Sequence, residues 1–257
     1  MLPSLFVSHG APTTLFDDVP VHRFLAGYAA GLPKPSAVIA VSAHWEEPVA
    51  SVSAAERPGT EHDFGNFGAA LHRFVYPAAG APALAREIAA SLAASGVPAR
   101  LDGDKGLDHG AWVPLALLYP GADVPVVQVS VHPTAGPAWH LALGRALRPF
   151  RADGALVLAS GNLTHNLAEV SWRGHGEVQG WAADFALWMA AAMAEGRIDD
   201  LLDYRRLAPS AVRNHPTDEH LMPLFAAVGA ASDGARGRRI HDSFTYGTLA
   251  MDAYAFD

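Results

Sequence analysis

Four short runs of apolar residues constrain the fold of this chain more than any other feature of its sequence. The runs are Leu2–Ser8, Ala37–Ala43, Pro125–Val131 and Ala155–Ser160. Three of them are rich in Val, Ile or Leu and lack a clean alternation with polar residues, which is typical of strands covered on both faces. They therefore predict an α/β fold with a mainly parallel central sheet and helices on both faces.

Helices are predicted between these strands and after the last of them. The expected helices are Val19–Leu32, Pro82–Ala94, Ala111–Tyr119, Pro137–Phe150, Trp181–Glu195 and one capped by Thr217 that runs to about Val228. The tail Thr248–Phe256 is predicted to be extended and to form an edge strand. No internal repeat and no Ser/Gly linker divides the chain, so we expect a single domain over residues 1–257.

The amino-acid composition excludes some kinds of active site and argues against some kinds of partner. The chain has 257 residues and no Cys, which excludes disulfides, thiol catalysis and thiolate metal sites. Its 18 basic and 26 acidic residues give a formal charge of −8, which argues against nucleic acid or an anionic membrane as a partner. No signal peptide or membrane span is expected, so a cytoplasmic protein is predicted.

The 13 histidines are the residues from which a metal site can be built. His9 and His44 each follow an apolar strand directly, and His165 comes shortly after the fourth strand. The carboxyl ends of parallel strands meet at one edge of a sheet, where sites form in open α/β folds. His109 and His220 lie at the predicted starts of helices. We therefore expect a metal site at the C-terminal ends of the strands.

Two neutral imidazoles, one further N or O ligand and open positions suit Fe(II), Zn(II) or Mn(II). With Fe(II), two adjacent open positions hold a chelating substrate and O₂ together. With Zn(II), one open position holds an activated water for hydrolysis. The sequence has no Gly-x-Ser-x-Gly elbow and no phosphate loop, so neither a serine hydrolase of that type nor a phosphate-loop enzyme is favoured.

Structural roles are considered for the remaining histidines and for three tryptophans, and a binding role for two arginines. Structural roles are expected for His22, His72, His140, His175 and His241. His132 is expected to lie where a strand passes into a loop. His215 is left open between a supporting role at the site and a loop position. Arg57 and Arg213 are candidate partners for a substrate carboxylate. Pocket lining and plain core packing are both open for Trp45, Trp112 and Trp181.

Six short motifs follow one another in the chain. They are Ser8-His9-Gly10, Ser42-Ala43-His44-Trp45, His62-Asp63-Phe64-Gly65, Asp108-His109-Gly110-Ala111-Trp112, Ser160-Gly161-Asn162 with His165-Asn166-Leu167, and Pro216-Thr217-Asp218-Glu219-His220. In this order the motifs resemble those of the DODA-type class III extradiol ring-cleavage dioxygenases of the LigB-like superfamily. The resemblance extends from residue 8 to about residue 224.

The resemblance implies a single catalytic domain that uses non-haem Fe(II) and O₂ to open a small aromatic diol beside its hydroxyls, giving a semialdehyde. Carried over by position, it makes His9 and His44 metal ligands. It implies His220 as the third ligand, with Glu219 as the alternative. His165 would be the base, or an extra ligand in a resting zinc form, and His109 would belong to the substrate pocket. Zn(II) is also a plausible metal in the purified protein.

Two rival functions are weighed against the dioxygenase. One is a zinc-dependent hydrolase built on the same histidines, and the other is a catalytically silent metal-binding member of the family. The two additional imidazoles, His109 and His165, favour turnover over simple metal storage. Residues His62, Asp63 and Phe64 either shape the pocket or form an ordinary polar loop. The ring substituent, the bond cleaved and the oligomeric state are left open.

Overall fold

The computed structural model describes residues 1–172 and 176–257. In these two ranges the central sheet has eight strands in the order β4-β3-β5-β2-β6-β1-β10-β7. Their bounds are β1 Ser4–Ser8, β2 Val38–Glu46, β3 Ala50–Ser53, β4 Ala99–Asp102, β5 Val126–Val131, β6 Leu156–Gly161, β7 Arg238–His241 and β10 Ala253–Phe256. Strands β8 Phe244–Thr245 and β9 Leu249–Ala250 form a small separate sheet.

The four strands predicted from the apolar runs are the middle of the sheet. Strands β5, β2, β6 and β1 lie side by side and pair in parallel. The flanking strands mix directions: β3 is antiparallel to β5 and parallel to β4, whereas β10 is antiparallel to both β1 and β7. The predicted mainly parallel sheet is therefore confirmed, with antiparallel additions at both sides.

Helices of the described residues fill the connections. They are α1 Pro20–Tyr28, α2 Ala69–Arg73, α3 Pro82–Ala94, α4 His109–Leu118, α5 Gly136–Leu147, α6 Pro149–Ala152, α7 Gly180–Glu195, α8 Ile198–Leu202, α9 Tyr204–Leu207, α10 Ala211–Asn214 and α11 Met222–Ala230. Short 3-10 turns occur at Pro12–Leu15, Ala29–Gly31 and Leu167–Glu169. None of the helices in the described ranges is long and apolar enough to cross a membrane.

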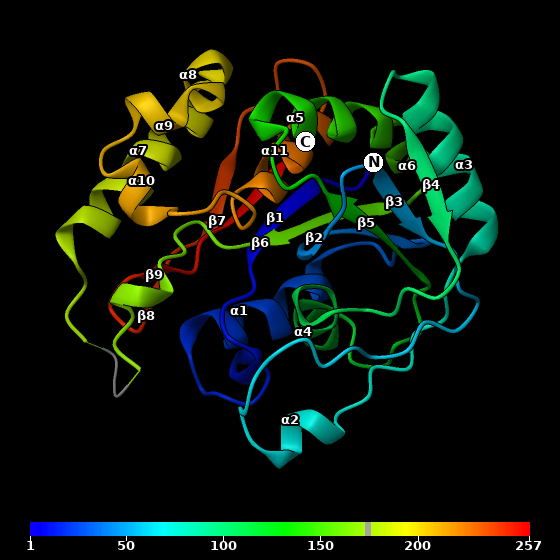
Figure 1. The fold of residues 1–257 in the computed structure, drawn as a ribbon, viewed down its shortest axis with the longest axis horizontal. Helices are drawn as coiled ribbons and strands as arrows, with labels where there is room; N and C mark the ends of the chain where they lie inside the picture. Colours follow the sequence, from blue (N-terminus) through cyan, green and yellow to red (C-terminus); the bar gives the residue numbers. More distant parts are fainter. Residues whose placement is uncertain (173–175) are drawn as a thin grey trace.

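The sheet separates two hydrophobic cores, which explains why its strands are apolar throughout. Along β2, Ile39 and Val41 pack into one core, and Val38 and Ala40 pack into the other. Helices α3, α5, α7 and α11 cover the first core, while α1 and α4 cover the second (Figure 1). Since successive side chains of a strand point to opposite faces, both sets of positions must be apolar.

Two sequence-based expectations are wrong. The last long helix does not begin at Thr217; α11 begins at Met222, directly before Pro223. Proline lacks an N–H and is best tolerated in the first turn of a helix, and a start near Thr217 would put Pro223 in the helix interior at a cost in stability. Residues 217–221 form a turn instead, and this turn carries Glu219 and His220.

The C-terminal tail is also placed differently from the prediction. Strand β10 is not an edge strand, because it lies between β1 and β7 and is fully buried. The edge on that side is β7, whose sequence Arg-Arg-Ile-His is partly exposed. Charged side chains on an edge strand oppose pairing with another chain, so β7 suits the edge better than the apolar tail.

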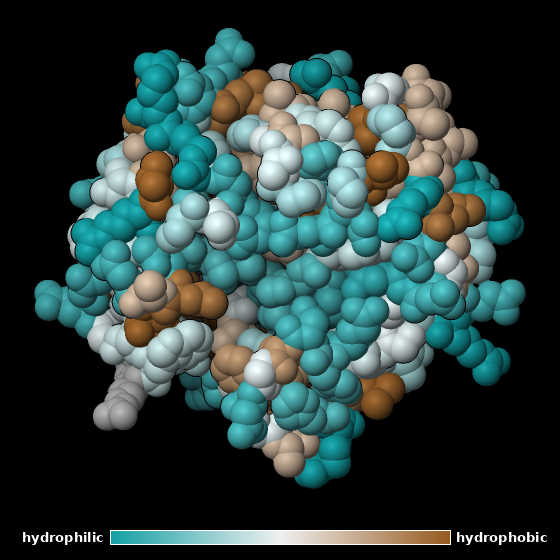
Figure 2. Space-filling model, in the orientation of Figure 1, coloured by the Kyte–Doolittle hydropathy of each residue, from teal (hydrophilic) through white to brown (hydrophobic). Residues whose placement is uncertain are grey.

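The outer surface is polar where Figure 2 displays it. On that face the hydrophobic residues lie in small groups separated by hydrophilic ones. Scattered exposed apolar residues are ordinary for a folded protein. That face therefore gives no indication of a partner surface.

Candidate metal centre

His9 is placed by a tight connection at the end of β1. Its backbone N–H donates to the carbonyl of Gly161 at the end of β6, over 2.9 Å. The next residue, Gly10, has φ +69°, and a side chain there would meet Met251 and Thr14. Its N–H donates to the Asn162 side chain. Glycine is required at this turn because it alone tolerates both the left-handed backbone and the close approach.

A bulge in β2 presents His44. Ser42 pairs with Ser130 of β5, and the next paired residue of β2 is Glu46, opposite Val131. Residues 43–45 are therefore additional on the β2 side. A bulge of this kind locally bends a strand and re-aims its side chains, and such bulges recur beside active sites.

His220 comes from the turn before α11. Its carbonyl accepts a hydrogen bond from the N–H of Asn162, 2.9 Å away. A methyl group at Gly161 would overlap that carbonyl oxygen. The turn that carries His220 is thus seated directly on the end of β6, next to the connection that carries His9.

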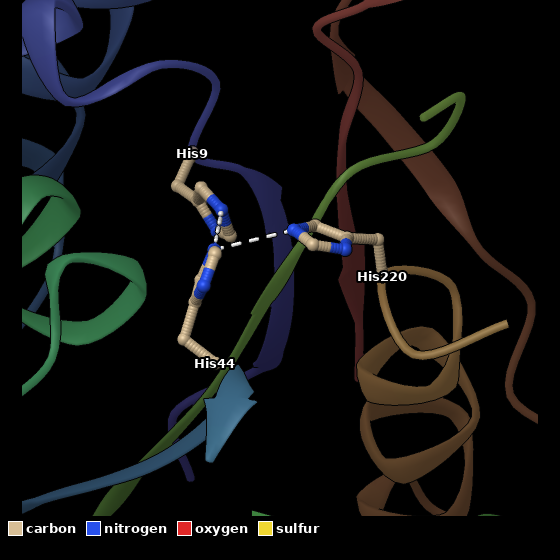
Figure 3. A group of neighbouring side chains, drawn as sticks. All are labelled: His9, His44 and His220. Atoms are coloured by element: carbon tan, nitrogen blue, oxygen red, sulfur yellow. Dashed lines mark hydrogen bonds between the residues drawn. The ribbon is translucent and has the colours of Figure 1, made fainter. Parts of the chain in front are cut away.

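The three imidazoles converge, as Figure 3 shows. The Nε2 atoms of His9 and His44 are 3.1 Å apart, and those of His44 and His220 are 3.2 Å apart. Each ring comes from a different part of the chain. The rings of His9 and His44 therefore face each other at the C-terminal ends of β1 and β2.

The opposite ring nitrogens show which atoms carry protons. Ser160 donates its hydroxyl proton to the carbonyl of Gly110, so it accepts from His9 Nδ1, 3.0 Å away. His220 Nδ1 donates to the Glu219 carboxylate over 2.8 Å. In the neutral rings of His9 and His220, Nε2 therefore presents a lone pair. Partners of this kind orient histidine ligands in metal sites.

This donor set fits a divalent ion. Metal–imidazole bonds of about 2.0–2.1 Å put neighbouring nitrogens roughly 2.8–3.4 Å apart for angles between octahedral and tetrahedral. The observed separations of 3.1 and 3.2 Å correspond to that spacing. Lone pairs this close repel each other unless a cation or a proton lies between them. His9, His44 and His220 also form one of the groups whose ligand atoms lie within 4.8 Å of one another.

Burial keeps these histidines neutral, as ligation requires. It lowers the pKa of His9 and of His220 well below the usual value, and the neighbouring imidazoles add to the effect. Burial likewise lowers the pKa of His44 to about 4, against the opposing pull of nearby carboxylates. A buried imidazole loses hydration when it becomes charged, so the neutral form is favoured.

His109 and Asp63 extend the site beyond the three rings. His109 begins α4, where Asp108 caps the helix, and its ring centre lies 3.8 Å from that of His44. Asp63 accepts from the backbone N–H and from Nδ1 of His109, at 2.9 and 3.0 Å. Burial raises the pKa of Asp63, but the hydrogen bonds and charge of His109 outweigh this and bring it to about 2.

His165 lies on the other side of the cluster. Its ring stacks on that of His220, with centres 3.4 Å apart, and its Nδ1 is 3.9 Å from the Glu219 carboxylate. Burial lowers the pKa of His165 to about 3, so the ring is neutral near pH 7. Glu219 bonds to the outer nitrogen of His220 and so lies behind that ring. It therefore supports His220 where the sequence left the two as alternative ligands.

A pocket of about 280 Å³ opens at the histidine cluster. His9, His44, His109, His165 and His220 all line it. The other lining residues are Gly10, Ala11, Pro12, Asp63, Phe64, Gly65, Phe67, Asn162, Leu167, Trp172 and Leu249. Ligand pockets commonly measure roughly 300–1,000 Å³, so this one suits a small molecule.

Several histidines lie outside the cluster, in line with the structural roles expected for them. The side chains of His22, His72 and His241 bond to Thr14, Gly65 and Ser243 respectively. His140 accepts from the N–H of His132. Buried His215 bonds to the carbonyl of Leu163, near the His165 loop. His175 lies outside the described residues.

The tryptophans and arginines considered from sequence do not line the pocket. Trp112 is core, Trp45 lies under Lys105, and Trp181 lies under Arg213. In the 62–64 segment, Asp63 and Phe64 line the pocket and His62 does not. Phe67 and Trp172 were missed, because they stand in loops whose path no local pattern predicts.

Comparison with known proteins accords with this geometry. The family described as the catalytic LigB subunit of aromatic ring-opening dioxygenase matches residues 4–257. The chain belongs to this family. Family membership and the histidine cluster together indicate a metal cofactor, an aromatic substrate and O₂.

Relatives of this LigB-family chain carry a more specific name. A "4,5-DOPA dioxygenase extradiol" of Portulaca grandiflora is 38% identical over 258 residues, covering 98% of this chain and 95% of that protein. One of Escherichia coli (strain K12) is 39% identical over 233 residues, covering 89% and 85%. The crystal structure of an uncharacterized protein from Escherichia coli K12 superposes with a TM-score of 0.84, at 32% identity and 100% coverage of both chains. The predicted family and enzyme class, extradiol ring-cleavage dioxygenase, are confirmed.

Proposed function

We propose that residues 1–257 form one catalytic domain, an Fe(II)-dependent extradiol dioxygenase that opens a small substituted catechol with O₂ to give a semialdehyde. The observation that carries this proposal is the convergence of three Nε2 atoms, 3.1 and 3.2 Å apart, beside a pocket of about 280 Å³. Relatives named 4,5-DOPA dioxygenase support the extradiol reaction and a catechol substrate.

His9, His44 and His220 would hold the iron through Nε2. A bound ferrous ion supplies the route by which electrons of the catechol reach O₂. The protein contributes ligand orientation from Ser160 and Glu219, which accept the Nδ1 protons of His9 and His220. Apolar side chains on one side of the pocket would reduce the contact of a bound ring with water.

His165 is the proposed general base. Its pKa of about 3 leaves it neutral at physiological pH, and its ring faces the pocket beside His220. Since Nδ1 is directed toward Glu219, we assign Nε2 to the proton of a catechol hydroxyl. The same nitrogen returns that proton to an oxygen later in the reaction.

His109 is the proposed second catalytic residue. Asp63 holds its Nδ1 proton, and the ring lines the pocket between His44 and Phe64. Nε2 is then available for a hydrogen bond to substrate or oxygen. A positioned group of this kind stabilises charge that develops during the reaction.

The test compares metals and substrates in one preparation. The metal-free protein is loaded anaerobically with Fe(II) or with Zn(II), and O₂ uptake is followed with catechols, including L-DOPA. We expect uptake and a ring-opened product with Fe(II) only. His165→Ala should keep its metal and lose about 10²-fold or more in rate, whereas His241→Ala, on the edge strand, should retain wild-type turnover.

The same experiment separates the rival functions. Ester or amide hydrolysis by the Zn(II) form, without O₂ uptake by the Fe(II) form, would make the protein a zinc hydrolase. Bound metal without either reaction would make it a silent family member. Zn(II) in a purified sample would agree with the proposal, because the same imidazoles accept both ions.

A further inference from the structure

His215 is a buried titratable side chain to which the proposed reaction gives no part. It is completely buried and does not line the pocket. Burial lowers its pKa to about 4, so the ring is neutral at pH 7. The rings of Phe185 and Tyr204 lie beside it, with centres 5.6 and 6.4 Å away. An apolar side chain would fill this space without the loss of hydration that an imidazole suffers, so the value of a histidine here lies in its hydrogen bonds.

One nitrogen of the His215 ring makes the bond that matters. Nε2 donates to the carbonyl of Leu163 over 2.8 Å, and both residues are completely buried. Nδ1 is buried without a hydrogen-bond partner in the part of the chain that the structure describes. An unpaired buried nitrogen is unfavourable, so the favourable contribution of this ring comes from its bond to Leu163. That residue lies two positions before His165.

The segment that contains His215 holds the loop of His165 by further hydrogen bonds. The N–H of His165 donates to the carbonyl of Asn214 over 3.0 Å. The side chain of Asn166 donates to the carbonyl of Arg213 over 2.6 Å. Three consecutive residues of one segment thus bond to the loop that carries the proposed base, and His215 is the one that does so through its side chain.

The same segment leads to the proposed metal ligand His220, five residues after His215. The rings of His165 and His220 stack with centres 3.4 Å apart. Arg205 fixes the path between His215 and His220, because it donates to the carbonyl of His215 over 3.1 Å and is paired with Asp218. His215 therefore bonds through its ring to the loop of the base and through its backbone to the segment of the ligand.

We propose that His215 is a positioning residue, whose Nε2–H bond to Leu163 holds the loop of His165 so that the ring of the base stays beside His220 and faces the pocket. The proposal rests on the dioxygenase function proposed above and adds a residue to its proton-transfer apparatus. Since His215 does not line the pocket, it acts through His165 and not on the substrate.

The first test changes the hydrogen-bonding ability of the side chain. His215→Leu removes the donor, whereas His215→Gln keeps an N–H donor of similar reach. In the Fe(II)-loaded protein we expect His215→Leu to lower kcat for a catechol by about 10- to 100-fold with little change in KM, and His215→Gln to restore most of the rate. His140→Leu is the matched control and should keep the wild-type kcat, because His140 is also completely buried and donates to a carbonyl, that of Gly136, but does not line the pocket.

A double variant tests whether His215 acts through the base. Adding His215→Leu to His165→Ala should cause no further loss of kcat, because the group that His215 positions is already absent. A further loss comparable to that of His215→Leu alone would show an effect independent of His165 and would overturn the proposal.

Crystal structures of the Zn(II)-loaded variants give a readout that needs no turnover. We expect the stacking of His165 on His220 to be lost in His215→Leu and kept in His215→Gln, with the three proposed ligands unmoved. If His215→Leu does not fold, Asn166→Ala, which removes another bond of the same loop, takes its place. A His165 ring that stays in position in these variants overturns the positioning role, whether or not catechols are turned over.

The two proposals fail in different ways. Absence of turnover for all catechols by the Fe(II)-loaded wild type, together with displacement of His165 in His215→Leu, would overturn the dioxygenase function alone. Turnover by the wild type and by His215→Leu at the same kcat would overturn the positioning role alone.

Discussion

At the scale of single residues, the hydroxyl of Ser160 sets the tautomer and orientation of His9, a proposed metal ligand. It accepts the proton of His9 Nδ1 and donates its own proton to Gly110, and it is completely buried. The same atom therefore fixes both the tautomer and the ring orientation. Removing such a partner usually weakens metal binding 10- to 100-fold.

We predict that Ser160→Ala lowers the affinity for Zn(II) by about 10- to 100-fold, because His9 loses the acceptor that keeps its Nε2 unprotonated. Metal competition with a chelating dye measures the affinity. Ser91→Ala is the matched control, since Ser91 also donates to a carbonyl, that of Ala146, far from the site. Unchanged Zn(II) affinity in Ser160→Ala would show that the tautomer does not depend on this hydroxyl.

At the scale of elements, the end of β6 assembles the site. Gly161 receives the N–H of His9 at its carbonyl, and the turn with His220 packs against its α-carbon. Asn162 holds both neighbouring connections, through Gly10 and through His220. One strand end thus sets the positions of two proposed metal ligands, His9 and His220, that are 211 residues apart in the chain.

We predict that Gly161→Ala displaces the turn that carries His220, because the added methyl overlaps a backbone oxygen that cannot rotate away. The expected destabilisation is about 1–3 kcal/mol, with loss of tight metal binding. Urea denaturation and metal titration measure the two effects. Gly27→Ala in α1 is the contrasting control: beyond the local helix backbone no atom lies within 4 Å of its added methyl, and a gain of about 0.5–1 kcal/mol is expected. Tight metal binding in Gly161→Ala would refute this account of the β6 end.

At the scale of the whole molecule, the cluster costs stability when it lacks a metal. Its buried imidazoles stay neutral in the folded protein, with pKa about 4 for His44 and about 3 for His165, but titrate near 6.5 when unfolded. Below pH 6.5 the unfolded chain therefore binds more protons than the folded one. The stability of the metal-free protein must rise with pH between these folded and unfolded values.

We predict that the free energy of unfolding of the metal-free protein falls as the pH is lowered from 6.5 toward 4, by up to ~1.4 kcal/mol per pH unit for each such histidine. Urea denaturation in the presence of a chelator measures it. Zn(II) at pH 7 should raise the denaturation midpoint, since an ion that binds only the folded state stabilises it. His44→Ala should have a shallower pH dependence, and an equal slope would contradict the assignment.

The local pattern of apolar and polar residues determined the central strands of this protein. The four central strands were recognisable because each is apolar on both sides, and the two separate cores show why. The residues that end these strands, His9 and His44, were recognisable for the same reason, since the end of a parallel strand is a defined place in an α/β fold. The order of six motifs identified the family before any contact was known.

Only the tertiary structure decided the supporting contacts of the site and the place of the C-terminal strand. These features depend on contacts between residues far apart in the chain. No local signal shows that Ser160 accepts from His9, that Asp63 holds His109, or that the loop of Trp172 reaches the pocket. The buried place of β10 likewise follows from pairing with β1 and β7, which a hydrophobic period cannot specify. Periodicity reports which face of an element is buried, whereas the partner across that face is chosen by the packing of the whole chain.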